Sequence, residues 1–369
     1  PGIQMLVSKK GKIVYNKSFG YHTYKKLNKL ENDHVFDLSS ITKILATMPL
    51  VIQEYETGNL SLNTKLNELF PKRKLADKGD ITLKEMLSHF ARLRPWIPFY
   101  EETLNRKEKP KSRFYKTNFR SSFSTPVSEN LYLKKNYRDK IFKSIVESEL
   151  IEKLEFKYSD LPFYFLKFWF EDIYNKPLDL LAEERIFNKL QLERTMFNPY
   201  KKLKLDEIVP TEEDDFFRYS KLHGYVHDEG AAMLGGVSGH AGLFSNSYEV
   251  AVILQTMIQG GLYNNHRLFN SESFDVFNTC YFCEYDNRSG VGFDKPQIEG
   301  KHGSTFGGVS MNSFGHYGYT GSMAWADPDE EIIFVFLSNR TFPTRENTLL
   351  QKSNIRTRSQ EIVYKSIID

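Results

Sequence analysis

Ser40 and Lys43, in the segment Ser40-Ile41-Thr42-Lys43, are the pair of residues in this sequence best suited to nucleophilic chemistry. A serine hydroxyl is a poor nucleophile until a base removes its proton. A lysine three residues further along a helix lies on the same face as the serine, but it accepts a proton only as a neutral amine. Its pKa must therefore be lowered by burial or by nearby positive charge. Because S-x-x-K occurs by chance in many helices, further motifs are needed to support the pair.

A second group with acid–base capacity lies downstream, in Tyr158-Ser159-Asp160. A tyrosine held beside the lysine can share the proton taken from the serine and pass it to the leaving group. It could do so as a hydrogen-bond relay or as a partly ionised phenol. The alternative is a turn whose aspartate caps the helix that follows, and the two descriptions are compatible.

A third segment, Gly315 to Gly321, reads Gly-His-Tyr-Gly-Tyr-Thr-Gly and precedes the last strands. Glycines let an edge strand approach a substrate closely, and a backbone N–H on that strand can face an oxyanion. A glycine-rich approach to a strand, with no ligand, is the alternative interpretation.

Helical patterns fill the middle of the chain and would position these groups. Apolar residues recur at helical spacing from 41 to 55, which predicts a helix that begins directly after Ser40. The N-terminus of that helix would stabilise negative charge that develops on the serine. Thr82 and Glu85 have the spacing of a capping box. Further helices are predicted over 161–174 and 247–260.

Strand patterns lie at the two ends of the chain, as hairpins over 4–15 and 323–337. They predict an α/β fold with an antiparallel sheet built from both termini, flanked by helices, and with an inserted, mainly helical lobe. We place the α/β domain at 1–80 and 215–369 and the lobe at 81–214. A polar, basic stretch over 107–140 is interpreted as a solvated insertion in the lobe, in preference to a loop that faces an acidic polymer.

Composition excludes several classes of function. A net charge of +3 is too small to indicate binding to nucleic acid or to an anionic membrane surface. No apolar run reaches the roughly 18 residues that a membrane-spanning helix needs. The chain begins at Pro1 without a leader pattern, which we interpret as a processed protein or an excised domain.

Two groups of residues have the chemistry of metal ligands. Cys280 and Cys283 lie close together, but no second cysteine or histidine pair completes a zinc site, so structural or loosely paired thiols are expected. His223, His227 and Asp228 could form a metal cluster, although a structural or substrate-lining role is favoured. We therefore expect no metal and no organic cofactor.

In this order and at these separations, the three motifs resemble the signature of the serine β-lactamase and penicillin-binding-protein family. That signature is S-x-x-K, then Y-x-N or S-D-N, then K-T-G or H-x-G. The tyrosine and His-x-Gly versions resemble the branch of class C β-lactamases, D-aminopeptidases and esterases. A closer similarity is to the β-lactamase-related domain of Bacteroidetes envelope proteins, which is often fused to a family 3 β-N-acetylglucosaminidase. This similarity lies in residues 95–100, 223–228 and 292–296.

The resemblance assigns the catalytic roles. It makes Ser40 the acylated nucleophile, Lys43 its base and Tyr158 the second proton carrier. Asp160 takes the place often held by asparagine, which removes an amide donor and adds negative charge near the lysine.

The resemblance also assigns the third motif. His316 and Gly318 would line the site, and the backbone N–H groups of Ser40 and Tyr319 would form the oxyanion hole. His316 stands where β-lactamases carry lysine, which weakens recognition of a β-lactam carboxylate. Any positive charge on this histidine would help to lower the pKa of Lys43.

As a whole, the resemblance implies a β-lactamase/transpeptidase-like fold and acyl transfer through a covalent ester on Ser40. It implies an ester, amide or peptidoglycan-fragment substrate, a periplasmic or cell-envelope location, and a glycosidase domain fused on the N-terminal side. Two rivals remain. One is a penicillin-binding protein that deacylates slowly, and the other is a cell-wall-binding module that accompanies a glycosidase without turnover.

Overall fold

The computed structural model describes residues 1–297 and 303–367. Its main sheet has five antiparallel strands in the order β13-β14-β15-β1-β2. The first two come from the N-terminal end, as β1 (Gly2–Lys9) and β2 (Lys12–Gly20). The other three lie near the C-terminal end, as β13 (Phe314–Tyr317), β14 (Met323–Asp327) and β15 (Ile332–Ser338).

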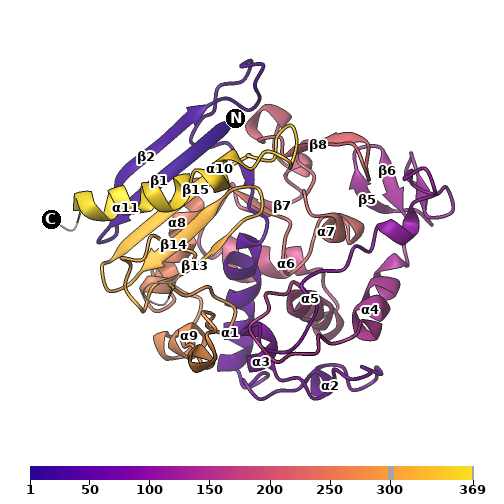
Figure 1. The fold of residues 1–369 in the computed structure, drawn as a ribbon, viewed down its shortest axis with the longest axis horizontal. Coiled ribbons are helices and arrows are strands. Elements are labelled where there is room, and N and C mark those ends of the chain that lie inside the picture. Colours follow the sequence, from indigo (N-terminus) through magenta and orange to yellow (C-terminus); the bar gives the residue numbers. More distant parts are fainter. Residues whose placement is uncertain (298–302, 368–369) are drawn as a thin grey trace.

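The sheet joins the two ends of the chain, as predicted, because β1 pairs with β15. Figure 1 shows the indigo N-terminal strands beside the yellow C-terminal ones. Both predicted hairpins are present: β1 pairs with β2, and β14 pairs with β15. The α/β fold with an inserted, mainly helical lobe is confirmed, whereas the domain boundaries stay a prediction.

The two faces of the sheet are covered by different helices. Alternate residues of a strand point to opposite faces. Along β15, Ile333 and Val335 belong to the large core that includes α8 (Ser247–Ile258), whereas Phe334 and Phe336 pack with Tyr364 of α11 (Ile355–Ile367). A layer of helices on each side thus buries the sheet, and β13 is left as an edge strand beside the lobe.

The helices follow the sequence patterns closely. The helix after Ser40 contains a π-helical turn over Lys43–Thr47 and continues as α1 (Met48–Glu56). Thr82 and Glu85 form the predicted capping box at the start of α3 (Leu83–Leu87). The predicted buried helix is α5 (Leu161–Tyr174). Further helices are α2 (Leu66–Leu69), α4 (Tyr137–Glu147) and α6 (Leu178–Ala182).

The basic stretch is more ordered than the sequence suggested. It contains a three-stranded sheet made of β4 (Tyr115–Lys116), β5 (Thr125–Ser128) and β6 (Leu131–Leu133). Tyr115 and Leu133 pair across two of these strands, and both side chains are buried. The small sheet therefore has its own attachment to the core, which a polar and aperiodic sequence did not reveal.

Short strands connect the segment before Ser40 to the glycine-rich segment. β3 (Phe36–Asp37) pairs with β10 (Leu243–Ser245), which also pairs with β7 (Met196–Phe197). Further elements are β8 (Glu212–Asp214), β9 (Ser220–Leu222), α7 (Glu229–Met233), α9 (Ser271–Asn278) and α10 (Leu349–Lys352).

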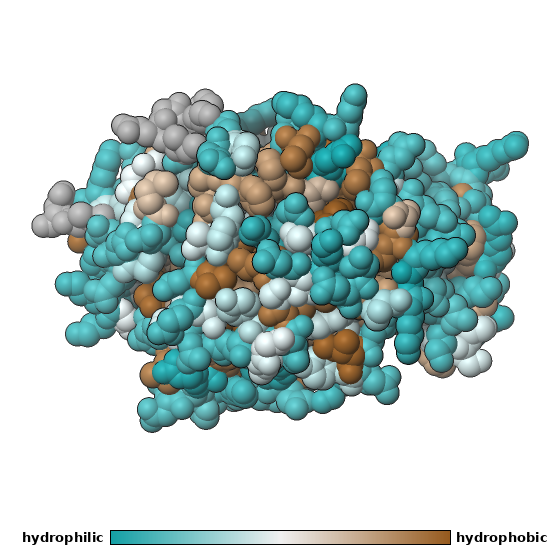
Figure 2. All heavy atoms as spheres, turned by 90° about the horizontal axis from the view of Figure 1, so that it is seen from below, coloured by the Kyte–Doolittle hydropathy of each residue, from teal (hydrophilic) through white to brown (hydrophobic). Residues whose placement is uncertain are grey.

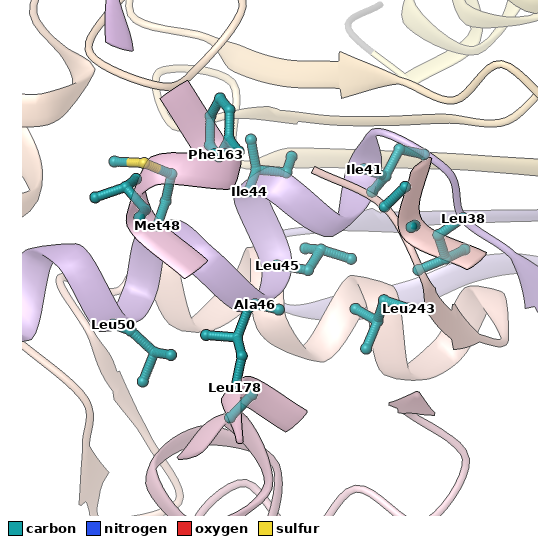
Figure 3. Packing of buried hydrophobic residues seen from close by; sticks show 14 of the residues in the cluster. Leu38, Ile41, Ile44, Leu45, Ala46, Met48, Leu50, Phe163, Leu178 and Leu243 are labelled. Carbon is teal, nitrogen blue, oxygen red and sulfur yellow. The ribbon is translucent and has the colours of Figure 1, made fainter. Parts of the chain in front are cut away.

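The helix that follows Ser40 is held rigidly by apolar packing. Ile41, Ile44 and Leu45 are fully buried and contact the main core. Figure 3 shows these side chains among residues of several elements, with Phe163 of α5 on one side and Leu243 of β10 on another. A nucleophile at the start of such a helix can hold its position without help from a substrate.

The outer surface is ordinary for a globular chain. Figure 2 shows a face that is mainly hydrophilic, with apolar side chains scattered across it. Within residues 1–297 and 303–367, no helix combines the length and the apolar character needed to cross a membrane.

Candidate active site

Ser40, Lys43 and Tyr158 form a closed triangle of hydrogen bonds. Lys43 Nζ donates to Ser40 Oγ at 2.8 Å and to Tyr158 Oη at 2.7 Å. Tyr158 Oη in turn donates to Ser40 Oγ at 3.0 Å. The structure therefore brings together the three residues that the sequence predicted, with both candidate proton carriers on the serine oxygen.

The backbone before the serine is sharply bent. Ser39 has a φ of +47°, in the left-handed region that few side chains adopt. Asp37 stabilises this bend by accepting a hydrogen bond from the Ser39 N–H at 2.8 Å. Thr320 adds a hydrogen bond to the Asp37 carbonyl at 2.8 Å. The bend places Ser40 directly before the first turn of the helix, facing the pocket described below.

Asp160 forms a buried ion pair with the lysine. Its Oδ1 lies 2.7 Å from Lys43 Nζ, and the two side chains are 15% and 0% exposed. Asp160 occupies the N-cap position of α5, but its side chain makes no cap hydrogen bond. The Ser159 Oγ accepts from the Leu161 N–H instead, at 3.2 Å. The expected negative charge near Lys43 is thus present, and the capping role belongs to the preceding serine.

Tyr158 is a neutral phenol in this environment. Burial raises its pKa well above the usual value, and the charge of Asp160 raises it further. The ring packs against His89, with 4.8 Å between the ring centres. Of the two modes expected for this tyrosine, a hydrogen-bond relay fits the site, and a partly ionised phenol does not.

His316 does not supply the positive charge that the sequence analysis considered. Its ring is 4% exposed, and burial lowers its pKa, so it is neutral near pH 7. The charge of Asp294 opposes this shift, and that of Lys43 adds to it. His316 Nδ1 lies 2.7 Å from the carbonyl of Tyr317, which makes Nδ1 the protonated nitrogen.

Gly318 and Tyr319 lie where β13 ends beside the serine. A Cβ on Gly318 would come within 2.6 Å of the Leu38 carbonyl, so only glycine allows this close approach. Arg340 fixes Tyr319, because its Nη2 and Nε donate to the Tyr319 carbonyl at 2.8 and 3.1 Å. Among the hydrogen bonds of the described residues, none has the backbone N–H of Ser40 or of Tyr319 as its donor. Both groups are free to meet an oxyanion.

These residues open onto a pocket of about 660 Å³ between the sheet edge and the lobe. Ser40, Tyr158, Asp160, His316, Gly318 and Tyr319 all line it. The sequence analysis did not single out several other lining residues as site residues: Trp96, Asp294, Arg340, Arg345, Gln351 and Arg356. They come from segments far apart in the sequence. Trp96 and Asp294 lie within the segments 95–100 and 292–296 noted above, but the resemblance gave these residues no role in the site.

Most charges on the pocket wall are already paired. Asp228 Oδ1 lies 2.9 Å from His240 Nε2, and Glu229 Oε1 lies 2.7 Å from Arg345 Nη2. Arg345 also bonds Glu212 at 2.6 Å. These pairs make a rigid polar wall beside the serine.

The histidines, aspartate and cysteines that were considered as metal ligands have other partners in the structure. His223 Nε2 bonds the carbonyl of Ile208, whereas His227 and Asp228 line the pocket, in keeping with the substrate-lining role favoured above. No cluster of three or more His, Cys, Asp or Glu suited to a metal occurs in the part of the chain that the structure describes. Cys280 and Cys283 form a disulfide, away from the residues that line this pocket.

A family model described as Beta-lactamase matches residues 1–354. The chain belongs to the beta-lactamase family. The relatives reported below are named as hydrolases. A candidate D-alanyl-D-alanine carboxypeptidase of Salmonella agona (strain SL483) is 31% identical, with 92% of this chain and 79% of the relative aligned. An N-acetylmuramyl-L-alanine amidase of Bacillus subtilis (strain 168) is 28% identical, with 92% and 77% aligned.

Solved structures show the same beta-lactamase fold. EstCE1, a hydrolase with promiscuous acyltransferase activity, superposes with a TM-score of 0.65 at 17% identity, over 96% of this chain and 93% of EstCE1. A penicillin-binding protein homologue from Caulobacter crescentus gives 0.62 at 16% identity, over 92% and 86%. The expected β-lactamase/transpeptidase-like architecture is thereby confirmed, and the family is one of serine hydrolases.

Proposed function

We propose that this protein is a serine hydrolase that transfers the acyl group of an ester, amide or peptidoglycan-related substrate to Ser40 and then to water. The observation that carries the proposal is the hydrogen-bond triangle of Ser40, Lys43 and Tyr158. It supports the proposal because Lys43 and Tyr158, the proposed base and proton relay, both hydrogen-bond to the Ser40 hydroxyl oxygen, at the mouth of a pocket large enough for a small substrate.

The reaction follows from this geometry. When Lys43 is a neutral amine, its Nζ takes the proton of Ser40 while Oγ attacks the carbonyl carbon of the substrate. The oxyanion is stabilised by the free N–H groups of Ser40 and Tyr319. The leaving group departs with a proton delivered through Tyr158, and the acyl ester remains on Ser40. Water then attacks this ester, with the same groups moving its proton, and the free acid is released.

The pocket favours small esters and amides over β-lactams. His316 is neutral and Asp160 carries negative charge, so neither offers the cation that would attract the carboxylate of a β-lactam. The names of the relatives point to peptidoglycan as the larger substrate class, and a substrate of that kind would place the protein in the cell envelope.

Kinetics with model substrates test the proposal. Wild-type protein should hydrolyse p-nitrophenyl acetate faster than a chromogenic cephalosporin, and Ser40→Ala should hydrolyse neither above the rate without protein. Faster turnover of the cephalosporin would overturn the ranking of substrates. Undiminished ester hydrolysis by Ser40→Ala would overturn the mechanism.

A further inference from the structure

Among the described residues, the side chain of one carboxylate in the pocket, Asp294, has no partner. The other acids on the wall are balanced, since Asp160 pairs with Lys43, Asp228 with His240, and Glu229 with Arg345. In residues 1–297 and 303–367, the Asp294 side chain makes no ion pair and no hydrogen bond, although its backbone is tied to Gly315 of the neighbouring strand. A carboxylate on a pocket wall with no cation beside it attracts a cationic ligand.

A buried hydrogen-bond acceptor in the same pocket is also unused. His316 Nδ1 is engaged with the Tyr317 carbonyl, so Nε2 carries the lone pair of the neutral imidazole. This Nε2 atom is buried, and no described group forms a hydrogen bond with it. Because a buried acceptor without a hydrogen bond is unfavourable, a ligand that donates a hydrogen bond to this atom gains affinity.

We propose that Asp294 and His316 Nε2 form an amine-binding subsite beside Ser40, which selects substrates that carry a primary ammonium group. An ammonium offers three N–H donors and a positive charge, and so matches an anionic acceptor and a neutral acceptor together. A carboxylate or phosphate at this position would face only hydrogen-bond acceptors and would find no donor. The inference rests on the proposed function, since it specifies which substrates that site takes.

The pocket charges that could compete for Asp294 are committed elsewhere. Arg340 uses Nε and Nη2 on the Tyr319 carbonyl and Nη1 on the carbonyls of Arg345 and Asn347. Arg356 lies over the Tyr317 ring, 4.1 Å from its centre, and bonds the Ser322 carbonyl. Neither arginine pairs with Asp294, which leaves the carboxylate for a ligand.

Binding to the Ser40→Ala protein tests the subsite without turnover. Isothermal titration should compare D-alanyl-D-alanine with N-acetyl-D-alanyl-D-alanine, which share a carboxylate and differ in the ammonium. We expect the free amine to bind at least tenfold more tightly, and we expect Asp294→Asn in the same background to reduce this preference below threefold. Asp294→Glu, which keeps the charge, should retain a preference. Asp275→Asn makes the same carboxylate-to-amide change at an exposed position on α9, and it should leave the preference as it is.

Equal affinity for the two dipeptides, or a preference that survives Asp294→Asn, would overturn the subsite. Release of D-alanine by the wild-type protein separates this inference from the proposed function. If the preference in binding holds but wild type hydrolyses neither dipeptide nor p-nitrophenyl acetate, the proposed hydrolase fails and the amine subsite stands.

Discussion

Lys43 is the residue on which the proposed acylation depends. Its Nζ lies within 2.8 Å of side-chain oxygens of Ser40, Tyr158 and Asp160, so it can reach both the nucleophile and the proton relay. Lys43→Met keeps most of the buried volume and removes the base. We expect acylation to slow by several orders of magnitude, measured in single turnovers. A Lys43→Met protein that acylates at the wild-type rate would remove the lysine from the mechanism.

Tyr158 acts through its hydroxyl hydrogen bonds. Tyr158→Phe removes the bonds to Ser40 and Lys43 and leaves the ring against His89. Acylation should slow by roughly 10²–10⁴-fold, the usual worth of a positioned acid or base. Because the pKa of Tyr158 is raised well above 10, the wild-type rate should show no phenol ionisation up to pH 10. A single-turnover profile that follows a tyrosine ionisation near pH 8 would contradict the relay.

At the scale of elements, the turn after β13 depends on a residue from the end of β15. Arg340 clamps the Tyr319 carbonyl and stacks over its ring at 4.7 Å. We regard it as a positioning residue for the Tyr319 N–H. Arg340→Lys should lower kcat for p-nitrophenyl acetate about 10–100-fold with little change in KM or in melting temperature, because misplacing an oxyanion donor costs less than its loss, which lowers kcat about 10²–10³-fold. A rise in KM at constant kcat would point to substrate binding instead.

The disulfide lies in an element that the chemistry does not use. Cys280 and Cys283 are three residues apart and close only a small loop at the end of α9. Loop closure over so few residues constrains the unfolded chain little. Cys280→Ser should keep ester hydrolysis within about twofold of wild type. A larger loss, together with loss of a metal in elemental analysis, would reveal a role that the structure does not give these residues.

Periodicity predicted the long elements well, and the reason is physical. The helix after Ser40, α5 and α8 are buried on most of their surface, so their apolar residues leave a readable pattern. The small sheet within the basic stretch rests on strands of two to four residues, which are too short to show alternation. The π-helical turn over Lys43–Thr47 has no sequence pattern of its own, because tertiary packing selects it.

At the scale of the molecule, the catalytic triangle was predictable and its surroundings were not. Ser40, Lys43 and Tyr158 stand in motifs with fixed spacing, and the structure brings them together. Asp294 and Arg340 reach the pocket only because the sheet joins both ends of the chain. The sequence does not show how close these two residues lie to Ser40 in the folded chain. The neutral state of His316 could not be predicted from the sequence for the same reason, since burial lowers its pKa and burial is a property of the whole fold.

The whole molecule should lose stability in mild acid because it buries neutral histidines. Burial lowers the pKa of His22 to about 4, and burial also lowers the pKa of His89 and His316. Unfolded chains bind these protons below about pH 6.5, and the folded protein does not, so stability rises with pH across this window. The free energy of unfolding in urea should therefore fall from pH 7 to pH 5.

A matched pair of variants isolates this effect. His22→Gln should lose less stability than wild type between pH 7 and pH 5, whereas His266→Gln, at an exposed position, should lose as much. Identical losses in all three proteins would show that other groups control the acid response.

The central claim is that Ser40 forms a covalent acyl-type bond, and activity-based labelling tests it most directly. Wild-type protein treated with a fluorophosphonate should gain the mass of one label per chain, and peptide mapping should place it on the segment that contains Ser40. Ser40→Ala should stay unlabelled while its circular dichroism and melting temperature match those of wild type. Label on a different residue, or equal labelling of a folded Ser40→Ala protein, would contradict the account.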